Sequence, residues 1–284
     1  MDNILEINDL VKEYKGFTLG EISVSLEKGS ILGIVGPNGA GKTTLIKTIL
    51  GMAIKNSGDV KVFGKDLATS GVEIRDRIGF INNDNPIKGT LTAKKLGDMY
   101  GKFYSKWDKK KYFEYLDRFE IPWSKHLMKL SQGMQMKVSL AFALSHEAEL
   151  LILDEPTSGL DPIFREEILD IFLEEIEDSQ KSIIISTHIT SDLDKCADYL
   201  LVMNQGKKLL YGSKDEILES HKLVKGDSAV LSEENKALFI NTKNNKFGFE
   251  GLTNRVDEVT KIMGKNHIIE KPRVEDIMVF YCKK

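Results

Sequence analysis

The sequence predicts an α/β fold built on a mainly parallel sheet, and three patterns support this prediction. Short, unbroken apolar runs at 31–35, 150–153 and 183–185 have the composition of strands that are buried on both faces of a parallel sheet. A helical pattern over 163–178 separates the last two runs, and a glycine-rich segment directly follows the first. Strands that alternate with helices along a chain form a parallel sheet with the helices on its faces.

Other segments complete the expected core. Apolar and polar residues alternate at 4–10 and 21–27, which predicts strands of an antiparallel β subdomain. A helix is expected from about Lys42, because apolar residues recur at helical spacing until Gly51 provides a stop. An Asn-Gln-Gly-Lys turn at 204–207 predicts a hairpin of two short strands.

The patterns divide the chain into two expected domains. Residues 1–218 carry the α/β pattern, with a helical insertion at about 87–147 where only helical periodicity is found. Beyond 218 this pattern ends, and 219–284 are expected to form a small α+β accessory domain. Its last helix is expected to open at Pro272, with acidic residues in the first turn.

Composition narrows the classes of function. With 43 acidic and 40 basic residues among 284, the net charge of −3 argues against broad nucleic-acid binding, which needs a basic face. Cys196 and Cys282 lie far apart without metal-ligand spacing, so a reduced, cytoplasmic chain without a disulfide framework or zinc site is expected. We find neither a signal-peptide pattern nor an apolar run of about 18–20 residues that could span a bilayer, so another chain would have to provide any membrane crossing.

The glycine-rich segment at 36–43 matches the pattern GxxxxGK[ST] between a predicted strand and a predicted helix. Glycines allow backbone N–H groups to surround phosphates, and the helix adds its positive N-terminal end. Lys42 is expected to reach the β- and γ-phosphates of ATP, and the Thr43 hydroxyl to ligate Mg²⁺. The expected nucleotide-binding residues of this segment are Gly36, Pro37, Asn38, Gly39, Ala40, Gly41, Lys42, Thr43 and Thr44.

Two carboxylates follow the apolar run at 150–153, where they would lie at the ligand-binding edge of the sheet. Asp154 is expected to hold Mg²⁺ opposite Thr43, and Glu155 to orient and deprotonate the attacking water. His188 follows the next apolar strand and would reach the same edge, beside the γ-phosphate.

Residues 130–135 read Leu-Ser-Gln-Gly-Met-Gln, and here the chain resembles the ATP-binding subunit of ABC transporters, whose signature is Leu-Ser-Gly-Gly-Gln. The resemblance covers residues 4 to about 218 and implies a P-loop NTPase with a RecA-like core. It implies that Ser131, Gln132 and Gly133 contact ATP held by a second subunit, together with the N-terminus of the following helix. A serine hydroxyl, a glycine N–H and a helix end also make an anion site on physical grounds, and Ser131 would cap that helix.

The same resemblance assigns two further roles and shows two departures. Tyr14 would stack on adenine. Two alternatives stay open, that Phe17 stacks instead and that Tyr14 only packs at the end of a strand. Asp161 would couple the two sites across the dimer. The Gln and Met of the signature depart from the common pattern but are typical of bacterial exporters with a separate membrane subunit. No glutamine follows 78–81, where the family has one, and Asn83 aligns best. Its shorter side chain would approach Mg²⁺ through a bridging water.

The chain is most similar to bacitracin-export-like ATPases, on 104–108, the signature and 271–278. This similarity implies an ATPase that powers export of a peptide, antibiotic or lipid-like substrate. The expected partners are a second ATP-binding subunit, identical or related, and a separate transmembrane permease that holds the chain at the inner face of the membrane. The accessory domain would help to hold the dimer or tune its closure.

The stretch 99–115 interleaves lysines with aromatic residues, and three interpretations stay open. The aromatic residues can pack the helical insertion while the lysines face water, the stretch can bind nucleic acid or a membrane, or part of it can receive the permease. Two other functions also remain, a soluble ABC ATPase acting on DNA or ribosomes and a P-loop kinase. The single cassette argues against the first, and the signature has no purpose in the second.

Overall fold

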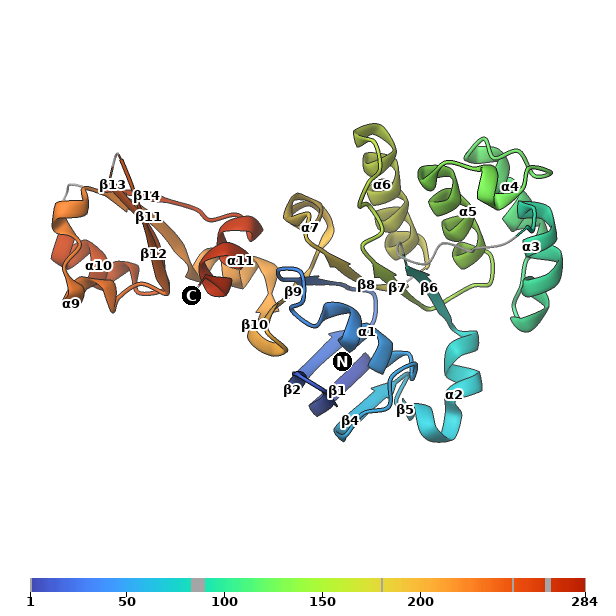
Figure 1. The fold of residues 1–284 in the computed structure, drawn as a ribbon, viewed down its shortest axis with the longest axis horizontal. Helices are drawn as coiled ribbons and strands as arrows, with labels where there is room; N and C mark the ends of the chain where they lie inside the picture. Colours follow the sequence, from blue (N-terminus) through green and yellow to red (C-terminus); the bar gives the residue numbers. More distant parts are fainter. Residues whose placement is uncertain (1, 83–89, 180, 247, 264–266, 284) are drawn as a thin grey trace.

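The computed structural model describes residues 2–82, 90–179, 181–246, 248–263 and 267–283. The strands of the larger sheet are β1 (Asn3–Tyr14), β2 (Phe17–Glu27), β3 (Ile31–Val35), β4 (Ser57–Val62), β5 (Lys65–Asp66), β6 (Ile78–Asn82), β7 (Leu150–Asp154), β8 (Ser182–Thr187), β9 (Tyr199–Asn204) and β10 (Lys207–Ser213). They lie in the order β5-β4-β1-β2-β10-β9-β3-β8-β7-β6 (Figure 1). Strands β9, β3, β8, β7 and β6 pair in parallel, whereas β1, β2, β4 and β5 pair antiparallel. The predicted α/β class and the antiparallel subdomain are both confirmed.

Helices lie on both faces of the parallel strands, and others form the insertion. The helices before the smaller sheet are α1 (Lys42–Ile49), α2 (Leu67–Asp76), α3 (Ala93–Tyr100), α4 (Lys109–Arg118), α5 (Gln132–Leu144), α6 (Pro162–Ser179), α7 (Thr190–Cys196) and α8 (Lys214–Ser220). Alternate residues of β7 enter two different cores. Leu151 and Leu153 join the core that contains residues of α5, α6 and α7, whereas Leu150 and Ile152 join the core that contains α1 and the antiparallel strands. Burial on both faces explains why this strand is apolar at four successive positions.

From residue 90, where the description of the insertion begins, it is helical as its periodicity predicts, with one isolated bridge between Thr92 and His126. Helices α3, α4 and α5 pack there around Tyr112, which is fully buried and lies 5.2 Å from Trp107 between ring centroids. Lys102, Lys106, Lys109 and Lys110 are exposed, Lys111 is half-buried, and Lys109 pairs with Asp98 at 2.6 Å. The aromatic residues of 99–115 therefore mostly pack within the insertion. Phe103 is an exception, because 80% of its surface is exposed.

A second, smaller sheet lies apart from the main sheet, at the left of Figure 1. Its strands are β11 (Lys222–Gly226), β12 (Asn241–Asn245), β13 (Gly248–Thr253) and β14 (His267–Glu270), in the order β12-β13-β11-β14. Two short helices, α9 (Glu233–Lys236) and α10 (Val256–Met263), belong to the same part of the chain. That residue 218 bounds an independent domain stays a prediction.

The last helix, α11 (Val274–Cys282), lies between the two sheets (Figure 1). It begins at Val274 rather than Pro272, because Arg273 is the cap: the Asp276 carboxylate accepts the Arg273 N–H at 2.9 Å. The expected acidic first turn is confirmed. At the other end, Asn204 donates to the carbonyl of Cys282 at 3.0 Å, which joins this helix to β9. Among the described helices, none has both the length and the apolar character to cross a membrane.

Candidate functional site

The glycine-rich loop connects β3 to α1 at the carboxyl edge of the parallel strands. A side chain at Gly36 would lie 2.2 Å from the Met203 carbonyl oxygen, so only glycine fits against β9. Gly41, just before α1, has a φ of 105°, a conformation that glycine adopts without strain. The N–H of Gly206, in the β9–β10 turn, donates to the Ala40 carbonyl at 2.9 Å and holds the loop from outside.

Lys42 is almost fully buried, with 7% of its surface exposed. Its Nζ donates to the Gly36 carbonyl at 2.8 Å and lies 3.7 Å from a carboxylate oxygen of Glu155. A buried ammonium needs an anionic or hydrogen-bonded partner. Lys42 is thus held with its charge directed into the loop, where a phosphate would be a stronger partner than a carbonyl.

Asp154 joins the loop to the end of β7. One carboxylate oxygen accepts from the Thr43 hydroxyl at 2.8 Å, and the other accepts from the Ser186 hydroxyl at 2.8 Å. The hydroxyl and carboxylate form an all-oxygen donor set, which fits Mg²⁺. No cluster of three or more His, Cys, Asp or Glu suited to a metal occurs among the described residues. A magnesium ion that takes few protein ligands and completes its shell with phosphate and water needs no such cluster.

Glu155 and His188 face each other at the same edge. Nδ1 of His188 lies 2.7 Å from Oε2 of Glu155, and the His188 backbone N–H donates to the same oxygen at 3.4 Å. Glu155 has a left-handed φ of 54°, and its N–H donates to the Ser186 carbonyl at 2.8 Å. The pairing gives Glu155 a fixed direction beside Lys42, where a water could lose its proton to the carboxylate.

A cavity of about 540 Å³ lies over the loop. Its lining residues are Phe17, Asn38, Gly39, Ala40, Gly41, Lys42, Thr43, Thr44, Glu155, Ser158 and His188. Gly36 and Pro37 are not among them, and Tyr14 is absent too. Tyr14 is 47% exposed, with the Lys12 ammonium 4.8 Å from its ring centre, whereas Phe17 lines the cavity.

The signature residues lie at another surface. Ser131 caps α5 by accepting the Met134 N–H at 3.3 Å, as expected of a helix N-cap. The loop after Glu155 lies against the signature, since a side chain at Gly133 would be 3.6 Å from Leu160. Asp161 caps the start of α6 by accepting the Phe164 N–H at 3.0 Å. None of these residues lines the cavity at the glycine-rich loop.

The site predicted from the sequence differs from the site in the structure at two residues. Asn83, expected to approach Mg²⁺, lies outside the described residues. Ser186 was not predicted, although it stands beside Asp154 in the β7–β8 register. A polar residue near the end of an otherwise apolar strand was the signal that could have identified it.

The sequence and the fold of this chain are similar to those of known proteins. A family model described as ABC transporter matches residues 19–158. Bacitracin transport ATP-binding protein BcrA of Bacillus licheniformis is 32% identical over 243 residues, which cover 84% of this chain and 79% of BcrA. ABC transporter ATP-binding protein YtrB of Bacillus subtilis is 28% identical over 219 residues, 77% of this chain and 75% of YtrB. A solved ATP-binding subunit of an ABC transporter superimposes with a TM-score of 0.69 at 27% identity, covering 76% of this chain and 92% of that one.

Proposed function

The chain belongs to the ABC transporter ATP-binding family, and we propose that it powers export of a peptide, antibiotic or lipid-like substrate through a separate permease at the inner face of the membrane. The chain is an ATPase. The observation that carries the proposal is one edge of the sheet on which Lys42, Thr43, Asp154, Glu155 and His188 meet. The name of BcrA, which refers to bacitracin transport, supports the substrate class.

We propose one task for each of these side chains in hydrolysis. Lys42 binds the terminal phosphates, and on doing so gives up its contact with Glu155. The freed carboxylate accepts a hydrogen bond from a water molecule and takes its proton as the water attacks. His188 Nδ1 keeps the carboxylate in place through the 2.7 Å contact. The products are ADP and phosphate.

The signature surface supports the proposal of a two-subunit site. Ser131 and Gly133 lie at the N-terminal end of α5, where a helix attracts anions, yet they do not line the cavity of their own chain. A second copy of this chain or a related subunit would bring its Ser131 to the phosphate held by Lys42. The loop from Glu155 to Asp161 runs from the cavity to the signature residues, so a displacement at one of these places can move the other.

Mg²⁺ is proposed to be held between Thr43 and Asp154, and to neutralise the phosphate charge when bound. Replacing Asp154 with Asn keeps the size of the side chain but removes its charge. We expect the Mg²⁺ concentration at half-maximal ATPase activity to rise at least about tenfold. Titration of the activity with MgCl₂ measures this shift. Asp170→Asn, an exposed change on α6, is the control, and an unchanged Mg²⁺ requirement in Asp154→Asn would contradict the assignment.

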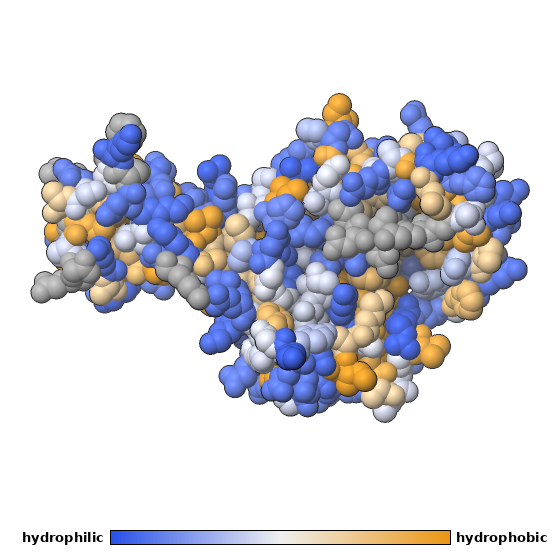
Figure 2. All heavy atoms as spheres, viewed as in Figure 1, coloured by the Kyte–Doolittle hydropathy of each residue, from blue (hydrophilic) through white to orange (hydrophobic). Residues whose placement is uncertain are grey.

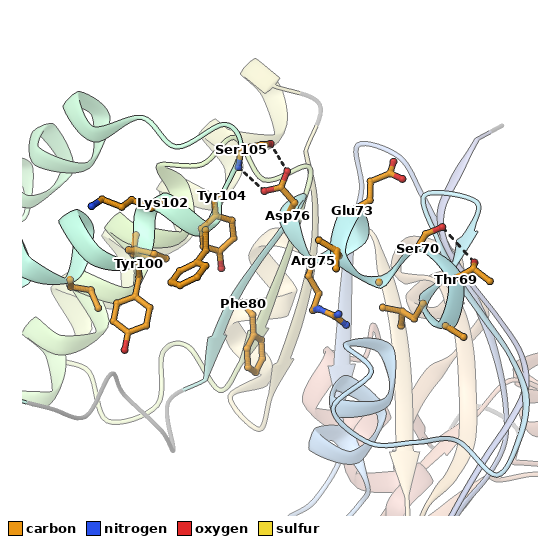
Figure 3. Close-up of a pocket in the computed structure, with 17 residues that line it drawn as sticks. Thr69, Ser70, Glu73, Arg75, Asp76, Phe80, Tyr100, Lys102, Tyr104 and Ser105 are labelled. Carbon is orange, nitrogen blue, oxygen red and sulfur yellow. Dashed lines mark hydrogen bonds between the residues drawn. The ribbon is translucent and has the colours of Figure 1, made fainter.

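The permease is proposed to dock in a groove of about 1310 Å³ between α2 and the helical insertion. Figure 3 shows Phe80 between a wall formed by Tyr100 and Tyr104 and a second wall formed by α2. The top is closed by Asp76, whose carboxylate accepts the Ser105 N–H at 2.8 Å (Figure 3). Burial opposes ionisation of Asp76, but the hydrogen bonds from Ser105 outweigh it and lower the pKa of this carboxyl.

Exposed apolar residues at the rim of this groove fit a protein partner. Val72 and Phe103 are 82% and 80% exposed, and Tyr100 is 45% exposed. In Figure 2, hydrophobic residues appear on the surface in the region that α2 and the nearby end of α3 occupy in Figure 1. Large exposed apolar side chains that gather at one groove mark an interaction site. The occupant we propose is an amphipathic segment of the permease, because the relatives named above are ATP-binding proteins of transporters.

Phe103→Glu tests this docking surface. The side chain is exposed, so the change should leave folding and the ATPase rate of the isolated chain unaltered while weakening co-purification with the transmembrane permease from the same cells. The matched control is Ile54→Glu, an 84% exposed apolar residue that does not line the groove. Undiminished co-purification and transport with Phe103→Glu would refute the docking site, and co-purification with ribosomes would favour the soluble alternative.

A further inference from the structure

We propose that Asp192 is a positioning residue for ATP hydrolysis, because its buried carboxylate ties the loop after Glu155 to the helix after His188. The proposal rests on hydrolysis at Glu155 and needs no membrane partner. Asp192 touches neither the cavity nor the expected phosphate position, so it would act through Glu155 and His188.

Asp192 is 1% exposed, in the first turn of α7. A carboxylate this deeply buried keeps its charge only when it is paired and hydrogen-bonded. Thr157 Oγ1 donates to one of its oxygens at 2.6 Å, and Arg165 Nε donates to the other at 2.6 Å. The carboxylate is therefore held from two directions, by α6 and by the loop from Glu155 to Asp161, called the catalytic loop below.

The hydrogen bond from Thr157 connects Asp192 to the catalytic loop. Thr157 is 2% exposed and lies two residues after Glu155. The next residue, Ser158, lines the cavity. A short loop that is fixed at a buried hydrogen bond keeps the residues on either side of it in place, so Asp192 sets the downstream end of the segment that carries the base.

Glu155 needs this support because its backbone is strained. A left-handed φ of 54° costs about 1 kcal/mol or more for a residue with a side chain and persists only where the surroundings enforce it. On one side, the Glu155 N–H is held by the Ser186 carbonyl at 2.8 Å. The bond between Thr157 and Asp192 restrains the other side.

The same carboxylate also fixes the histidine. Helix α7 begins at Thr190, two residues after His188, and Asp192 lies in its first turn. One buried group thus restrains both partners of the 2.7 Å contact between Glu155 and His188. Displacing a catalytic group by about 1 Å can slow a reaction by about 10²-fold.

The alternative is that Asp192 only fastens α6 to α7. The structure offers a matched comparison, because Lys195 and Glu166 form a second ion pair between the same two helices. The Lys195 and Glu166 side chains are 50% and 59% exposed, and neither lines the cavity at the glycine-rich loop. Loss of that pair removes a link between the helices without releasing Thr157.

The test uses the full chain with Thr157→Val, Thr157→Ser, Asp192→Asn and Lys195→Ala. Thr157→Val preserves shape but removes the donor to Asp192. We expect kcat to fall about 10- to 100-fold, as for a displaced catalytic group, with the dissociation constant for ATP unchanged. Thr157→Ser should restore most of the rate, because it returns the hydroxyl. Asp192→Asn should show the same split between kcat and affinity, and Lys195→Ala should match the wild type.

Two results would overturn the proposal. One is a wild-type kcat in Thr157→Val with a wild-type melting temperature. The other is an equal loss of kcat and of ATP affinity that Thr157→Ser does not restore, which indicates general loosening of the domain. Should Asp192→Asn fail to fold, the two Thr157 variants decide the question alone.

Discussion

Replacing Glu155 with glutamine is expected to stop turnover while ATP binding is kept. The amide has the size of the carboxylate and can still contact His188, but it cannot take a proton from water. Loss of a general base lowers the rate by about 10²- to 10⁴-fold. Because ATP then persists between the subunits, the variant should also accumulate as an ATP-dependent dimer.

Three measurements on Glu155→Gln separate these effects. Phosphate release gives the rate, nucleotide titration gives the affinity, and light scattering with and without ATP gives the mass. Glu166→Gln, on the exposed face of α6, is the control for the chemical change. Phosphate release at the wild-type rate would remove Glu155 from the catalytic role, whatever the affinity.

Replacing Lys42 with alanine is expected to act on binding itself. The ammonium is buried and already directed into the phosphate loop by the Gly36 carbonyl and Glu155. Loss of a charged hydrogen bond costs about 1.5–3 kcal/mol, which corresponds to about 10- to 150-fold weaker ATP binding. Hydrolysis should fall further, because the same charge stabilises the phosphate during transfer.

The matched control for Lys42 is Lys47→Ala. Both lysines belong to α1, but Lys47 is exposed in its last turn and does not line the cavity. We expect isothermal titration to show wild-type ATP affinity for Lys47→Ala. Equal affinities for Lys42→Ala and the wild type would show that the loop does not bind phosphate in the expected way.

Local motifs carried most of what the sequence predicts about the site. Lys42 and Thr43 are identified by the spacing of neighbouring glycines, and Asp154 and Glu155 by the apolar strand before them. These signals are local because the loop and the strand end are built from consecutive residues. The hydrogen bond between Thr43 and Asp154 follows from the same two motifs.

Features that depend on tertiary contacts could not be predicted in this way. The sequence gives no indication that Thr157 and Asp192 meet, because they belong to different segments and only the pairing of β7 with β8 brings those segments together. The groove beside Phe103 has the same origin, since it forms where α2 lies opposite the insertion. The strands of the smaller sheet were not located either, because residues such as those at 241–245 are polar and have weak β propensity.

The central claim is that a complete site needs the signature of a second subunit, and mixing two inactive variants tests it most directly. Lys42→Ala lacks the ammonium that binds phosphate but keeps Ser131, whereas Ser131→Arg keeps Lys42 but blocks the signature. In a mixed dimer of the chain, one site would combine the intact loop of one copy with the intact signature of the other. ATPase activity that appears only on mixing is the predicted result. A mixture as inactive as its components, or a monomeric Ser131→Arg that hydrolyses ATP at the wild-type rate, would contradict the claim.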